Sequence, residues 1–162
     1  MLQRIQTIYL FISGIIILLL LYFPYITIIS ENNNEFSIQI TSWGIDLISG
    51  TSNVFVTNLT TITVSLIIIV SGLLSFFIIS IYKKRQLQIK LGKINLILLT
   101  ALLVLMMFFI DNAMELLMCK NNCSRSLSTG IFFPVTAIIF SFLANRSIKK
   151  DEDKVRDTNR IR

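Results

Sequence analysis

Four long apolar runs, separated by short polar segments, constrain the fold of this chain more than any other feature of its sequence. The first run lies within residues 5–29, a stretch without a charged residue. A helix needs about 20 apolar residues, each adding about 1.5 Å, to cross the roughly 30 Å hydrocarbon layer of a bilayer. Only 15% of the residues are charged, against about 25% in soluble domains. The pattern predicts an all-α membrane protein with four transmembrane helices in an antiparallel bundle.

The 162 residues are expected to form a single membrane domain, because four spans leave no length for a second folded unit. The spans are expected near residues 5–25, 60–82, 94–112 and 129–148, and a cytoplasmic tail at 149–162. The third span is expected to continue as helix to Met118, and the tail to extend the fourth helix, since its charges alternate in sign. A signal peptide starting at Arg4 is the alternative for the first run, but no small-residue cleavage site follows it.

The basic residues predict how the chain is threaded. Residues 83–93 hold several cations and no acid, and all but two of the 15 Lys and Arg lie there, at Arg4 or from Arg146 onward. Since cytoplasmic loops carry the excess of Lys and Arg, we interpret residues 83–93 as a cytoplasmic turn and place both termini in the cytoplasm. The net charge of +6 then indicates attraction to anionic lipid headgroups and no nucleic-acid partner.

The two outer segments carry strand-like and cysteine signals. Phe36, Ile38 and Ile40 alternate with polar residues, so we expect two or three short strands within residues 30–60, lying on the outer membrane surface with Trp43 near the headgroups. A partly ordered loop is the alternative. In the second outer loop, 119–128, the possible disulfide joins Cys119 and Cys123 if the outer compartment is oxidising; two free thiols are the alternative.

Small residues at helical spacing predict where the helices pack. Ser71 and Ser75 are one turn apart in the second span, and Ala137, Ser141 and Ala144 form a stripe on the fourth. Such residues let two helices approach closely. For the two serines of the second span, hydrogen bonding back to their own helix is the alternative.

Chemical motifs are absent from the sequence. The chain has no His, the commonest general base, and no nucleotide-binding or hydrolase motif. We therefore expect no enzyme, no cofactor and no metal. Asp111 and Glu115, one turn apart at the outer end of the third helix, could bind a cation, relay protons or act as an acid pair, but we favour a solvated helix end. No acid lies near the middle of a span, which disfavours ion-coupled transport.

Three segments together resemble an uncharacterised bacterial family of four-span inner-membrane proteins, a domain of unknown function. They are MLQRIQTIYL (residues 1–10), RQLQIKLGKIN (85–95) and FLANRSIKKDE (142–152), the last continuing to the final residues. The chain departs from that pattern at Gly92, often Cys, and at Asn159, often Asp. The resemblance implies a bacterial inner-membrane location and leaves the activity open. The span arrangement and a strand-bearing first outer loop are also similar in shape to claudins, although claudins carry their cysteine pair in that first loop.

All three segments fall on the cytoplasmic side by the charge argument. This suggests a docking patch for a partner protein or anionic lipid; ordinary juxtamembrane anchors are the alternative. The patch comprises Arg4, Gln88, Lys90, Asn95, Asn145, Arg146, Lys149, Asp151, Glu152 and Arg156.

The sequence thus favours a structural or accessory subunit whose partners are the lipid bilayer and other membrane or cytoplasmic proteins. A small transporter or channel component is the alternative function. It would need an aqueous path lined by hydroxyl groups, namely those of Ser71, Ser75, Thr100, Thr136 and Ser141.

Overall fold

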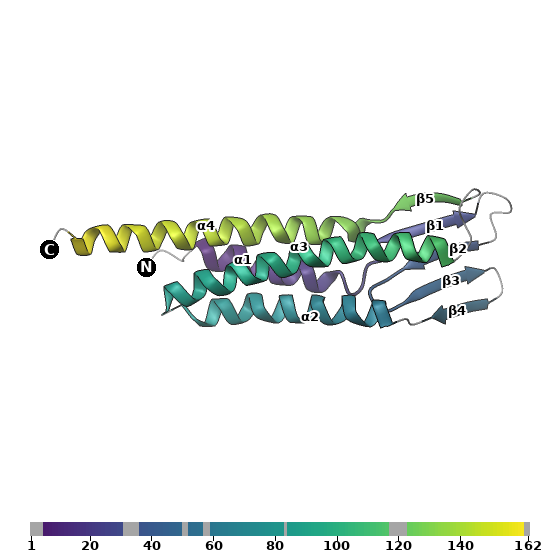
Figure 1. Cartoon of the computed structure of the whole chain (residues 1–162), viewed down its shortest axis with the longest axis horizontal. Coiled ribbons are helices and arrows are strands. Elements are labelled where there is room, and N and C mark those ends of the chain that lie inside the picture. Colours follow the sequence, from purple (N-terminus) through teal and green to yellow (C-terminus); the bar gives the residue numbers. More distant parts are fainter. Residues whose placement is uncertain are drawn as a thin grey trace.

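The computed structural model describes residues 5–30, 36–49, 52–56, 59–82, 84–116 and 123–160. In these ranges the chain forms four α-helices: α1 (Ile5–Leu19), α2 (Leu59–Ser80), α3 (Arg85–Leu116) and α4 (Phe132–Arg160), the last preceded by a 3-10 turn, η1 (Thr129–Ile131). Each helix packs against two others in the ring α1–α2–α3–α4, and neighbours run antiparallel (Figure 1). The expected antiparallel helix bundle is therefore present.

The outer surface of the bundle is apolar. Within the described residues, three helical segments are long and apolar enough to cross a membrane: Thr61–Ser80, Arg85–Ile110 and Thr129–Glu152. Large side chains such as Leu66, Phe77 and Phe108 are exposed on these helices. A soluble monomer rarely exposes so much contiguous apolar surface, which indicates a membrane protein.

The first helix is shorter than the sequence suggested. α1 has 15 residues and ends at Leu19, whereas the first span was expected to reach residue 25. Pro24 has no backbone N–H and restricts the residue before it to extended conformations. The following run, Ile26–Ser30, forms strand β1, because β-branched residues favour strands.

A five-stranded antiparallel sheet is formed by the described residues at one end of the bundle, so the protein is not all-α. Its strands are β1, β2 (Phe36–Ile40), β3 (Ile45–Ser49), β4 (Ser52–Val56) and β5 (Cys123–Leu127), in the order β4-β3-β2-β1-β5. The strands expected in the first outer loop are confirmed as β2, β3 and β4, but β1 and β5 were missed. The sheet extends the long axis of the bundle beyond the helices (Figure 1).

The sheet and the bundle share one core. Ile28, Ile38 and Ile40 of β1 and β2 belong to the same buried cluster as Met106 and Phe109 of α3. Cross-strand register places Ile28 opposite Ile38, so these isoleucines lie on one face of the sheet. The apolar positions Ile38 and Ile40 of the alternation therefore belong to the face of the sheet that is buried in the shared core.

Hydrogen bonds fasten the β2–β3 turn to the helices. The Ser42 hydroxyl donates to the Leu20 carbonyl oxygen at 3.0 Å, and the Trp43 indole donates to that of Leu21 at 2.9 Å. The Ser65 hydroxyl of α2 in turn donates to the Ser42 carbonyl oxygen. The turn thus supplies donors to the carbonyl groups of the two residues that follow α1, whose own last carbonyls accept the backbone N–H groups of residues 20–22.

At the opposite end, the connection between α2 and α3 is shorter than expected. α2 ends at Ser80 and α3 begins at Arg85, so most of residues 83–93, interpreted above as a turn, is the first part of α3. The predicted helical extension of the fourth span is confirmed, since α4 continues as one helix to Arg160.

Candidate docking site at the basic end of the bundle

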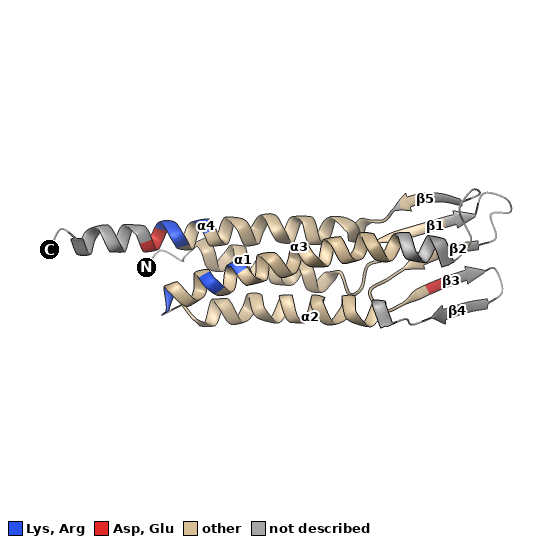
Figure 2. Cartoon of the chain, viewed as in Figure 1, with Lys and Arg blue, Asp and Glu red and all other residues tan. Residues whose placement is uncertain are grey.

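Charge is segregated along the long axis. Where side chains are described, every Lys and Arg lies at the end of the bundle opposite the sheet (Figure 2). Lys90 and Lys93 are exposed on α3, and Arg146, Lys149 and Lys150 are on α4. We call this region, from Lys84 to Lys93 and from Asn145 to Glu152, the basic end. The middle of each apolar span carries no charged residue.

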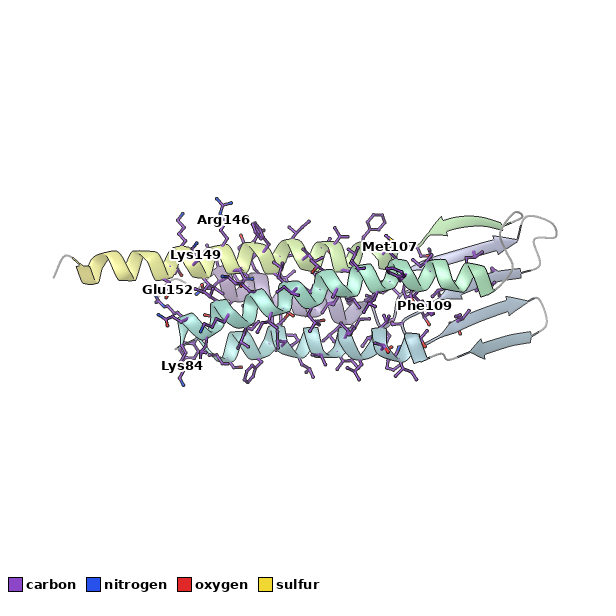
Figure 3. All side chains as sticks on the ribbon, in the orientation of Figure 1. Lys84, Met107, Phe109, Arg146, Lys149 and Glu152 are labelled. Atoms are coloured by element: carbon purple, nitrogen blue, oxygen red, sulfur yellow. The ribbon has the colours of Figure 1, made fainter. Side chains whose placement is uncertain are left out.

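A groove of about 490 Å³ opens between α3 and α4 at the basic end. It is lined from α3 by Ile89, Lys93, Leu96 and Ile97, and from α4 by Phe142, Asn145, Arg146 and Lys149. Figure 3 shows Arg146 and Lys149 extending from the same side of α4. The groove combines the two features a docking site for an amphiphile needs, an apolar floor and a cationic rim.

The groove depends on a close approach of the two helices. A Cβ atom at Gly92 of α3 would collide with the Asn145 side-chain oxygen of α4. A glycine at this position lets the Asn145 amide lie directly against the α3 backbone. At the end of the groove, the Arg85 guanidinium donates to the Asp151 carbonyl oxygen at 3.2 Å and joins the start of α3 to α4.

Two members of the predicted patch are inside the bundle. Gln88 is 2% exposed and donates to the Ile78 carbonyl oxygen at 3.3 Å, and Asn95 is 0% exposed and donates to the Ser75 hydroxyl at 2.9 Å. Residues 88, 92 and 95 share one face of α3 because they are four and three apart. Gln88 and Asn95 therefore hold α3 against α2, and their assignment to a surface patch was wrong.

The interior beside these amides is polar. The Ser13 hydroxyl of α1 donates to the Ala137 carbonyl oxygen at 3.0 Å and pairs with the Ser141 hydroxyl at 2.8 Å. Ala137, Ser141 and Ala144 are all buried, which confirms the predicted packing stripe on α4. Four buried amide oxygens in this half of the bundle have no partner among the described residues, those of Gln6, Gln88, Asn95 and Asn145.

The hydroxyl groups expected to line an aqueous path do not lie together. Ser71 and Ser75 are buried and donate to carbonyl oxygens of their own helix, at 3.0 Å each. Thr100 is exposed on α3 and donates to the Ile97 carbonyl oxygen. A residue on the outer face of the bundle cannot line its interior, so these residues form no single path.

The remaining candidates are placed only in part. Asp151 and Glu152 are half-buried on α4, and Arg156 belongs to the same helix. Arg4 and Cys119 lie outside the described residues, so the disulfide to Cys123 stays a prediction. Asp111 and Glu115 belong to helix α3. In the described part of the chain no group of His, Cys, Asp or Glu could hold a metal ion.

Most of the groove was not predicted from the sequence. Its lining follows helical spacing, at residues 89, 93, 96 and 97 of one helix and 142, 145, 146 and 149 of the other, with apolar and cationic side chains on both. Two such stripes next to cations were a usable signal. However, a lipid-facing stripe shows the same pattern, and only the packing of α3 on α4 distinguishes the two.

The fold and this site define a small helical membrane protein with an antiparallel sheet at one end and a basic groove at the other. The chain belongs to a family described as a domain of unknown function (DUF4293), whose model matches residues 2–161. No curated protein matches the chain.

Proposed function

We propose that this chain is a four-span protein of the bacterial inner membrane, a structural or accessory subunit without catalytic chemistry. It docks a partner protein or anionic lipid through the basic end, which faces the cytoplasm together with both termini. The segregation of charge carries the proposal: where side chains are described, every Lys and Arg lies at one end of the bundle (Figure 2). Positive segments are retained on the cytoplasmic side during insertion.

The short α1 is compatible with a fourth span. Fifteen helical residues cover about 22 Å, and the apolar turn 20–24 continues toward the sheet. Ile8, Phe11 and Ile15 are exposed on α1, as expected for a helix that faces lipid. Beyond it, exposed Tyr22 and Trp43 supply the aromatic side chains that settle at a membrane interface.

Labelling of single cysteines tests the topology. In a background with Cys119→Ser and Cys123→Ser, we expect Ser126→Cys on β5 to react with an impermeant maleimide in spheroplasts. Lys84→Cys and Lys150→Cys should react only after the membrane is opened. Labelling of Lys150→Cys in closed spheroplasts would contradict the orientation.

Crosslinking tests the docking. Arg146→Glu with Arg156→Glu reverses two charges of the predicted patch, and we expect at least one crosslinked partner or lipid to be lost. Asp46→Lys, at the sheet end, is the control and should leave the crosslinks intact. An identical set of crosslinks in wild type and the reversed variant would refute docking through this end.

A further inference from the structure

The groove between α3 and α4 is divided into a charged and an apolar part. The two helices are antiparallel, so the order of side chains along one is reversed along the other. From the basic end inward, α3 presents Ile89, Lys93 and then Ile97, while α4 presents Lys149, Arg146 and then Phe142. The three cations therefore belong to the outer and central parts of the groove, beside Ile89, and its inner part toward the middle of the bundle is apolar.

We propose that this groove binds one anionic phospholipid, with its phosphate among Lys93, Arg146 and Lys149 and an acyl chain along Ile97 and Phe142. The proposal rests on the function proposed above and names the ligand of the same basic end. A volume of about 490 Å³ lies within the range of roughly 300–1,000 Å³ usual for small-molecule sites.

The positive charge of the groove favours an anionic ligand. In the described part of the chain, none of the three cations forms an ion pair with a carboxylate. The described acids at this end, Asp151 and Glu152, follow Lys149 on α4 and are absent from the groove lining. Arginine forms paired hydrogen bonds with phosphate oxygens, and lysine contributes a further point charge. Basic pockets between helices on the cytoplasmic side suit anionic headgroups.

The apolar part favours a lipid over an acidic peptide. Ile97 is 65% exposed and Phe142 is 55% exposed, so this part of the groove opens on the face of the bundle that meets the bilayer. A peptide placed there would bring unpaired backbone N–H and C=O groups into hydrocarbon, at a cost of several kcal/mol for each group. An acyl chain carries no such groups.

Native mass spectrometry of the full chain in detergent tests the inference, with phosphatidylglycerol and phosphatidylcholine of identical acyl chains as probes. The groove variant is Lys93→Gln, Arg146→Gln, Lys149→Gln. The matched control, Lys84→Gln, Lys90→Gln, Lys150→Gln, removes the same charge from residues outside the groove lining. We expect wild type to retain one phosphatidylglycerol and the groove variant to bind it more than tenfold more weakly, since each cation near anionic lipid contributes about fivefold. The control should change binding less than threefold.

A second pair of variants tests the acyl-chain part independently of charge. Ile97→Trp should fill the groove and weaken phosphatidylglycerol binding at least fivefold. Val104→Trp, two turns further along α3 and also exposed, should not. As a control for folding, the thermal unfolding of all four variants is measured with phosphatidylcholine present. An unchanged unfolding temperature ensures that the losses reflect binding.

Equal losses in the groove variant and its charge control would overturn the groove site while leaving docking through the basic end intact. Equal retention of both lipids by wild type would also overturn it. The crosslinking experiment above would then decide separately whether the basic end docks a protein.

Discussion

The two halves of the bundle interior are built differently. Toward the sheet, the core consists of large apolar side chains. Ile17, Leu20 and Leu102 are examples, and none of these three is more than 2% exposed. Toward the basic end, the buried cluster is small and includes Leu10, Ala144 and others, with amides and serines beside it. The same four helices thus enclose a dense apolar core at one end and a polar interior at the other.

This difference assigns stability mainly to the sheet half of the bundle and binding to the basic half. Well-packed apolar cores set most of the stability of a fold, whereas buried polar atoms without partners cost free energy and tend to persist where function needs them. All four unpartnered amide oxygens found in the described residues lie in the basic half, and one of them, that of Asn145, belongs to a residue that lines the groove. We therefore expect the sheet half to anchor the fold and the basic half to tolerate change.

The largest effect is expected from Leu102→Ala in the sheet half. Leu102 is completely buried, and truncation leaves a cavity that costs about 2–5 kcal/mol of unfolding free energy. SDS titration in mixed micelles measures this loss. Val104→Ala on the exposed face of the same helix is the control and should cost less than about 0.5 kcal/mol. Equal losses would mean that the apolar core does not anchor the fold.

A pair of glycines compares the two halves directly. A Cβ at Gly130 would lie 2.5 Å from the Pro24 carbonyl oxygen, a backbone atom that cannot rotate away. Gly130→Ala should therefore cost about 1–3 kcal/mol in the same titration. In Gly92→Ala the new Cβ meets only the end of the Asn145 side chain. The gain in helix propensity, about 1 kcal/mol, offsets the cost of displacing that side chain. A larger loss at Gly92 than at Gly130 would reverse the comparison.

Asn95→Leu tests whether the polar interior contributes to stability. The change removes the hydrogen bond to Ser75 and also the unpartnered carbonyl oxygen. An interhelical hydrogen bond in a membrane contributes about 1 kcal/mol. The cost of losing this bond and the gain from removing the unpartnered oxygen therefore nearly cancel. We expect the unfolding free energy to change by less than about 1 kcal/mol. A loss above that would mean that the hydrogen bond from Asn95 contributes strongly to stability, and it would weaken the distinction between the halves.

Tyr25→Phe has the smallest expected effect. Tyr25 lies in the sheet half, and its buried hydroxyl has no partner among the described residues. Removing this hydroxyl relieves an unsatisfied polar atom, so the unfolding free energy should stay the same or rise by about 1 kcal/mol. Ser42→Ala, which deletes the hydrogen bond to Leu20, is the comparison and should destabilise. Loss of stability in Tyr25→Phe would reveal a polar network in the sheet half.

Much of the fold could be predicted because it depends on local pattern. The second span, expected at 60–82, is α2 at Leu59–Ser80, and the alternation around Ile38 and Ile40 is β2. A hydrophobic run of sufficient length predicts a helix in lipid whatever its neighbours are, and period-two alternation predicts a strand with one buried face. These features require no knowledge of tertiary contacts.

The candidate site was predictable only in part. Lys90, Arg146 and Lys149 are at the basic end, as their position in the sequence indicated, because juxtamembrane cations report on topology. Gln88 and Asn95 were misplaced, since a polar residue normally indicates an exposed position. Their burial follows from hydrogen bonds to α2 that no spacing pattern reveals.

By itself the sequence determined a helical membrane protein with apolar spans, basic residues at one end and strands in its first outer segment, because composition and periodicity suffice for these. Only the tertiary structure decided that β5, a mostly polar segment, pairs with β1, since an edge strand is stabilised by the partner it meets and not by its own pattern. The same holds for the groove. Its cations and apolar residues come from the first part of α3 and the middle of α4, which are far apart in the sequence, and the packing of α3 on α4 brings them together.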